Sequence, residues 1–153
     1  MAYPSIHEPA TNAELLRRID ALSPAALPLW GRMTVSQMLM HCCMPYRSIL
    51  HPKERESPSR WTRLMGRLFF KRIMTGTRDY RRGLPTGKAF VVTTEPAFGR
   101  TRERLKGLLT EVHGMGEARF EGMEHPLIGT LSARQWSNLL YKHLDHHLRQ
   151  FGV

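Results

Sequence analysis

Apolar residues recur every three or four positions in four separate segments of the chain, and this period limits the possible folds more than any other feature. Such spacing is typical of amphipathic α-helices, and no strand pattern repeats beside it. The stripes are Leu15, Leu16, Ile19 and Leu22; Val35, Met38, His41, Cys42, Pro45 and Ile49; Phe98, Leu105, Leu108, Leu109 and Val112; and Trp136, Leu139, Leu140, His143, His147 and Phe151. The sequence therefore predicts an all-α protein.

The length predicts one domain over residues 1–153, because a single core serves about 100–200 residues. The adjacent Cys42 and Cys43 cannot staple distant segments together. The longest uncharged run, residues 33–46, is shorter than the roughly 20 apolar residues of a membrane-spanning helix, so no membrane span is expected. The first residues lack a secretory signal pattern, and a cytoplasmic protein is the expectation.

Local signals predict where the helices begin and end. A capping-box pattern at residues 11–14 predicts the start of the first helix at Thr11, and Thr34 and Ser132 are predicted to cap the second and the last helix. Pro45 predicts a kink or an end in the second helix, because proline cannot donate a helical hydrogen bond. Glycine-containing loop residues lead up to Gly129.

The net charge of +10 is concentrated in one region. Residues 47–82 carry 11 basic and three acidic side chains, a local charge of +8. Most of this region lies in a long connector, residues 51–96, between the second and third stripes. Such a surface could bind a phosphate backbone, an anionic substrate or a membrane surface. Alternatively, it is a solvated, positively charged face that keeps the protein soluble. No nucleic-acid-binding motif accompanies the charge.

Residues 60–74 of the connector predict an additional, cationic helix. Its apolar stripe is Trp61, Leu64, Met65, Leu68, Phe69 and Ile73, with Arg60, Arg63, Arg67 and Lys71 opposite. Such a stripe could lie on a membrane, but packing on the other helices or on a second subunit is more common and is the expectation here.

Three histidines lie on core-facing stripes and are the candidate metal ligands: His41, His143 and His147. Residues four apart are neighbours on a helix, so His143 and His147 can converge on one ion, and His41 can join them from the second helix. Three histidines leave coordination positions open, as in catalytic zinc sites. Unpaired buried imidazoles would be unfavourable by roughly 1–3 kcal/mol per group. Alternatively, His41 could be a core histidine that is hydrogen-bonded to a backbone carbonyl oxygen, and residues 143–147 could form a pH-sensitive polar face.

Neighbouring residues have simpler interpretations. A thiolate ligand from Cys42 or Cys43 is possible, but packing is favoured for small buried cysteines. His146 lies about 100° around the helix from His147, so it could lie behind the ligand histidines or at the surface, and the surface is favoured. Asp145 could accept a hydrogen bond from a ligand histidine, although its position favours solvent or a partner.

The segments WGRMTVSQMLMHC (30–42), HPLIGTLS (125–132) and YKHLDHHLRQFG (141–152) resemble the DinB-like (DinB/YfiT) metal-binding superfamily, most closely a branch of bacterial proteins without an assigned activity. The resemblance implies a four-helix bundle with a cationic helix inserted between its second and third helices. It also implies a divalent metal ion, zinc or nickel, on His41, His143 and His147. Known activities of the superfamily include transferases that use low-molecular-weight thiols, hydrolases and isomerases. The chain departs from the pattern at Leu148-Arg149, where a small residue is usual, and in its long basic connector.

The leading functional hypothesis is a metal-dependent enzyme that activates water or a thiol of a small-molecule substrate. No acid or base residue can be named from the sequence, a homodimer is plausible, and nucleic acid is not an expected partner. The alternative is a non-catalytic basic module that recognises nucleic acid or an acidic partner. A third hypothesis is a degenerate bundle kept for assembly, with the histidines empty.

Overall fold

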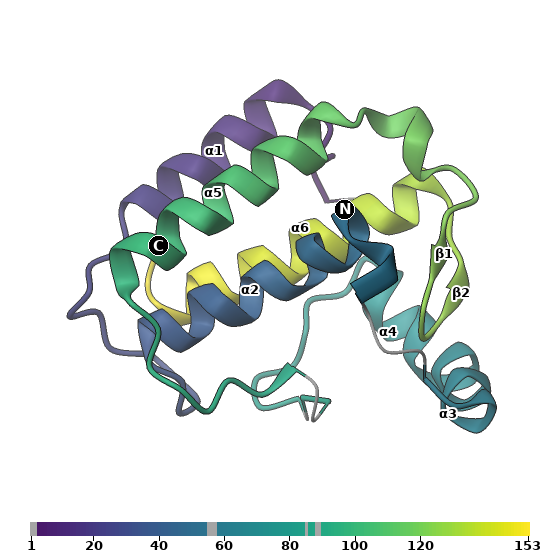
Figure 1. Ribbon diagram of the computed structural model, residues 1–153, viewed down its shortest axis with the longest axis horizontal. Coiled ribbons are helices and arrows are strands. Elements are labelled where there is room, and N and C mark those ends of the chain that lie inside the picture. The colour runs from purple at the N-terminus through teal and green to yellow at the C-terminus, as the bar shows by residue number, and fades with distance from the viewer. Residues whose placement is uncertain (1–2, 55–57, 85, 88–89) are drawn as a thin grey trace.

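The computed structural model describes residues 3–54, 58–84, 86–87 and 90–153, and most of them are helical (Figure 1). The all-α class is therefore confirmed. The four longest helices of the described residues are α1 (Pro9–Asp20), α2 (Val35–Leu50), α5 (Phe98–Gly114) and α6 (Ala133–Gln150). None of the helices described is long and apolar enough to cross a membrane.

The four long helices share one apolar core. In Figure 1, α1 lies beside α5, and α2 lies beside α6; α2 also packs extensively on α5. Each helix contributes fully buried side chains to this core, which include Leu15 and Ile19, Met38 and Leu39, Leu105 and Leu109, and Leu140 and Leu144. Six of these residues belong to the four stripes that predicted the helices, and Leu39 and Leu144 are buried in addition to the stripes.

Capping boxes begin two of the helices, as predicted. The Thr34 hydroxyl accepts from the Gln37 amide, and Ser132 accepts from the Gln135 amide, while each glutamine returns a hydrogen bond to its cap. The predicted start of the first helix at Thr11 is wrong. That helix begins two residues earlier, because Pro9 suits the first turn, where no amide donor is needed.

The second helix continues past Pro45 to Leu50, so the expectation that it ends there is not met. Proline cannot donate to the carbonyl oxygen four residues earlier, which here belongs to His41. The Ser48 hydroxyl donates to the Pro45 carbonyl oxygen at 2.9 Å and adds a bond in the turn that follows. The core side chains on both sides of Pro45, Cys42 and Ile49, hold the helix in place.

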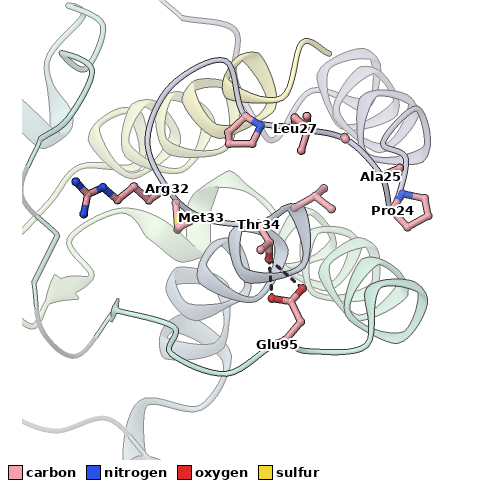
Figure 2. A pocket seen from close by; sticks show the side chains of 10 residues that line it. Pro24, Ala25, Leu27, Arg32, Met33, Thr34 and Glu95 are labelled. Atoms are coloured by element: carbon pink, nitrogen blue, oxygen red, sulfur yellow. Dashed lines mark hydrogen bonds between the residues drawn. The ribbon is translucent and has the colours of Figure 1, made fainter.

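The connector runs back along the start of α2. Figure 2 shows a recess between the loop that follows α1, the first turn of α2 and the connector residue Glu95, with a volume of about 390 Å³. The Thr34 hydroxyl donates to the Glu95 carboxylate, whose oxygens lie 3.0 and 2.9 Å away. This contact anchors the connector on the helix that carries His41.

A short hairpin lies in the segment expected to be a glycine-containing loop. Its strands β1 (Glu124–His125) and β2 (Gly129–Thr130) pair antiparallel. The strands have two residues each, which is too short for a period-2 pattern to be visible in the sequence.

The cationic helix extends over residues 60–75, which we call the helical arm. It consists of α3 (Arg60–Met65), a π-helical turn (Gly66–Phe70) and α4 (Lys71–Thr75). The arm projects from the long helices beside the hairpin (Figure 1). Its apolar stripe is exposed, so the expectation that this stripe packs on the other helices of the chain is wrong.

Candidate metal centre

Three imidazole rings meet between α2 and α6. His41 comes from the middle of α2, and His143 and His147 come from successive turns of α6. Their ring centroids lie 4.8 to 4.9 Å apart in every pair. One ring nitrogen from each residue lies within 4.8 Å of those of the other two, which is close enough to hold a metal ion.

The spacing suits a tetrahedral ion. Zn–N bonds of about 2.0–2.1 Å place two ligand nitrogens about 3.4 Å apart. In the structure, Nε2 of His41 lies 2.9 Å from Nε2 of His143, and no pair of ligand atoms exceeds 4.8 Å. The ideal separation lies between these values, so small side-chain rotations bring the nitrogens to metal distance.

Two oxygen acceptors fix the orientation of two of the rings. Nδ1 of His41 lies 2.9 Å from the carbonyl oxygen of Phe90, and Nδ1 of His147 lies 2.9 Å from Oε1 of Gln150. A carbonyl oxygen can only accept, so each Nδ1 carries the proton and each Nε2 keeps its lone pair. Acceptors of this kind typically orient histidine ligands of metals.

His143 completes the cluster differently. Its Nδ1 is buried without a hydrogen-bond partner among the described residues, and its Nε2 is directed at His41. If His143 is protonated on Nδ1, the Nε2 lone pairs of His41 and His143 face each other at 2.9 Å. A cation between them removes that repulsion, so the donor set fits a divalent ion.

Burial keeps the three imidazoles neutral at pH 7. It is the main cause that lowers the pKa of His41, and it lowers the pKa of His147 to about 4, although the bond to Gln150 opposes this shift. For His143, burial and the neighbouring histidines hold the pKa well below its usual value. Neutral imidazole is the form that binds metals.

A second group of side chains lies beside the cluster. The ring of His146 is 5.2 Å from that of His147, and it meets Trp30 and Tyr80 edge-on. The guanidinium of Arg82 lies 4.3 Å from the centre of the Trp30 ring. The sequence favoured a surface position for His146, but the residue is half-buried.

The adjacent cysteines pack in the core, as favoured from the sequence. Both are buried, and burial raises the pKa of Cys43 to about 11 and that of Cys42 well above its usual value. Asp145 faces neither a ligand histidine nor open solvent. Its carboxylate pairs with Arg18 at 2.8 Å and with Arg149 at 3.0 Å.

Sequence reasoning missed the residues that orient the ligands. Gln150 lies three residues after His147 on the same helix face, and this spacing could have indicated it. Its Nε2 donates to the Trp30 carbonyl oxygen at 2.6 Å, which fixes the amide orientation. The acceptor at Phe90 is a backbone oxygen, which leaves no mark in a sequence.

A known protein family matches almost the whole chain. A family model described as "Protein of unknown function (DUF1569)" matches residues 6–152. The chain belongs to the DUF1569 family. No curated protein and no solved structure matches it. The description of the DUF1569 family names no activity.

Proposed function

We propose that this protein is a metal-dependent enzyme, of the thiol-transferase or hydrolase type, with a divalent ion on His41, His143 and His147. The observation that carries the proposal is the convergence of three neutral ring nitrogens within 4.8 Å of one another. Imidazole ligands suit zinc and nickel. A divalent ion on three histidines, when bound, lowers the pKa of a coordinated water or thiol and so supplies a nucleophile near neutral pH.

The chain's own residues hold and aim the ligands. The Phe90 carbonyl oxygen and the Gln150 amide keep the protons of His41 and His147 on Nδ1. His41 and His147 are 5% and 9% exposed, so little water reaches these two rings. These contacts fix the rings before an ion arrives, which reduces the entropy lost on binding.

The group beside the cluster supports a small anionic substrate. Arg82 makes no ion pair with any residue that the structure describes, and its guanidinium lies on the Trp30 ring, near His146. A planar guanidinium binds carboxylate or phosphate through two parallel hydrogen bonds. We assign to Arg82 the role of holding the anionic group of a substrate, such as a low-molecular-weight thiol that carries a carboxylate.

We further infer that the long helices form a DinB-like four-helix bundle, with the helical arm inserted between its second and third helices. The support is the packing of α1, α2, α5 and α6 on one core, with a histidine on α2 and a histidine pair on α6. Superposition of an experimental structure on DinB-like bundles tests this inference, and a different helix order around the core would contradict it.

Metal analysis of protein purified without a histidine tag tests the proposal. We expect about one zinc or nickel ion per chain in the wild type and a loss of most of it in His143→Ala, because two ligands hold a divalent ion far more weakly than three. The matched control is His51→Ala, which removes an exposed histidine outside the cluster. Equal, low metal contents in wild type and His143→Ala would contradict the proposal and favour a bundle with empty histidines.

The alternative function is a non-catalytic basic module that recognises nucleic acid or an acidic partner. Several side chains of the basic region, residues 47–82, are already engaged within the protein, including Arg47 with Glu54 and Arg63 with Glu124. Salt-dependent binding to arbitrary DNA, unchanged in His143→Ala, would favour this alternative.

A further inference from the structure

The helical arm turns its apolar side chains to the solvent. Trp61 is 76% exposed and Leu68 is 65% exposed, fractions unusual for residues on the apolar stripe of an amphipathic helix. The exposed set comprises Trp61, Leu64, Met65, Leu68, Phe69, Phe70 and Ile73. A contiguous patch of this kind marks an interaction surface.

Another side of the arm, which adjoins the apolar patch at Leu64, is fixed to the hairpin. The Arg63 guanidinium pairs with the Glu124 carboxylate, and the Lys71 ammonium donates to the Thr130 carbonyl oxygen at 2.8 Å. Gly66 is buried, and a Cβ atom there would lie 2.5 Å from the Leu127 carbonyl oxygen. This close approach holds the arm against the hairpin through that side.

The end of the arm is fixed to α6. The buried Lys142 ammonium donates to the carbonyl oxygens of Ile73 and Gly76 at 2.6 and 2.9 Å, and the Asn138 amide donates to that of Thr75 at 3.0 Å. A cation at the carboxyl end of a helix also stabilises its dipole. The arm cannot rotate its apolar side inward without breaking these contacts as well as those to the hairpin.

The charge around the apolar patch indicates what covers it. Arg60, Arg63 and Arg67 line a recess of about 320 Å³ directly beside Leu64. Glu124 pairs with Arg63 and lies 3.8 Å from Arg67, so one carboxylate offsets only part of the charge of three guanidinium groups. Residues 47–82 as a whole carry a net charge of +8. Two copies of the same patch would bring these like charges together, which disfavours a second copy as the occupant. Arginines beside exposed tryptophan, phenylalanine and leucine are typical of helices that lie in the surface of an anionic membrane.

We propose that the helical arm binds the surface of a membrane that contains anionic lipids. Trp61, Leu68 and Phe69 enter the boundary between headgroups and acyl chains, and lipid phosphates occupy the arginine-lined recess. The arm lies in the plane of the surface and does not cross the bilayer. The metal centre plays no part in this binding, so membrane binding and the proposed enzymatic function can be tested independently.

Vesicle flotation of the purified full-length chain tests this proposal. The probes are vesicles of phosphatidylcholine alone and vesicles of phosphatidylcholine mixed with phosphatidylglycerol. We expect the wild type to float with the anionic vesicles, to bind the neutral ones at least about tenfold more weakly, and to dissociate as salt is added. On anionic vesicles the tryptophan emission shifts to shorter wavelengths, because Trp61 leaves water.

Variants distinguish binding through the arm from unspecific adsorption of the protein to vesicles. We expect Trp61→Ser combined with Phe69→Ser to weaken binding at least about tenfold, since each large apolar side chain contributes at least about that factor when it leaves water. Leu27→Ser, which removes an apolar side chain that is 82% exposed outside the arm, should bind as the wild type does. Arg60→Gln should weaken binding to anionic vesicles only.

Three outcomes would overturn the proposal. The first is that the wild type does not bind anionic vesicles. The second is that Leu27→Ser weakens binding as much as the double variant does. The third is a dimer in analytical ultracentrifugation that Trp61→Ser combined with Phe69→Ser dissociates, because a second copy then covers the patch. Metal content measured on the same samples reports separately on the metal centre.

Discussion

The ligand histidines depend on acceptors of two different kinds. His41 is oriented by a backbone oxygen at Phe90, whereas His147 is oriented by the side chain of Gln150, which also donates to the Trp30 carbonyl oxygen. Only the second acceptor can be removed by a single substitution. Position 150 therefore offers a direct test of how much ligand orientation contributes to metal affinity.

We expect Gln150→Leu to weaken metal binding about 10- to 100-fold, which is the usual effect of removing the acceptor behind a ligand histidine. Gln150→Glu keeps an acceptor for His147, loses the donation to Trp30 and adds a negative charge near the ion, so its metal affinity should fall less than that of Gln150→Leu. Competition with a chromophoric chelator measures both. Equal losses in the two variants would show that the acceptor at this position does not act through His147.

The metal-free protein should lose stability in acid. In the folded chain, burial lowers the pKa of His147 to about 4, whereas in the unfolded chain the group titrates near 6.5. Between these pH values the unfolded chain binds more protons, so its population grows as the pH falls. His41 and His143 shift in the same direction. The His147 shift alone corresponds to about 3 kcal/mol.

Urea denaturation in the presence of a chelator, at several pH values between 7 and 4, measures this loss of unfolding free energy. His147→Leu should depend less on pH than the wild type over this interval, because one of the shifted groups is gone. The same pH dependence in both proteins would exclude His147 as a cause of the acid sensitivity.

Among the elements, the helical arm shows how one small residue sets the position of a helix. Gly66 allows the arm to approach Leu127 of the loop between the two strands, whereas Gly107, inside α5, has open space around it. Both glycines lie in helical segments without a positive φ. An added methyl group should therefore act in opposite directions at the two positions.

We expect Gly66→Ala to lower the unfolding free energy by about 1–3 kcal/mol, because the new Cβ atom meets backbone that cannot move aside easily. Gly107→Ala should raise it by about 0.5–1 kcal/mol, since alanine restricts the unfolded chain and fits the helix. Urea denaturation measures both changes. A stabilised Gly66→Ala would mean that the arm does not rest on the hairpin in solution.

The long helices could be predicted because their apolar stripes and capping boxes are local signals. Thr34 caps α2 and Ser132 caps α6, as the sequence predicted. The outward direction of the arm could not be predicted, because it depends on Glu124 and Lys142, which are distant in sequence. A stripe of apolar residues defines a helix face but does not tell which way the face points.

For the molecule as a whole, the three histidines join α2 to α6. A ligand that binds only the folded state stabilises it, by about 2.7 kcal/mol at a free concentration one hundred times its dissociation constant. We therefore expect zinc or nickel to raise the melting temperature of the metal-free wild type by roughly 5–10 °C. Calorimetry measures the shift, and His143→Ala should show almost none. A similar shift in that variant would place the ion elsewhere.

The sequence placed His41, His143 and His147 on core-facing stripes, and they do lie together. That part could be predicted, because helical spacing determines which side chains share a face. The surroundings of the site could not. The Phe90 carbonyl oxygen contacts the cluster, and Tyr80 and Arg82 contact His146 and Trp30 beside it. All three residues come from the part of the connector that follows the arm, which has no helical or strand periodicity, so their positions follow only from the folded chain.

The bond between His41 and the backbone oxygen of Phe90 affects how mutational scans of this protein should be read. Almost any residue at position 90 supplies the same backbone oxygen, so a point substitution there removes only the edge-on contact of the Phe90 ring with His41 and should have a small effect. Deleting or inserting one residue in the connector would move that oxygen away from the ring while leaving every neighbouring side chain type unchanged. Segment length, rather than residue identity, is the quantity that selection can act on at this position.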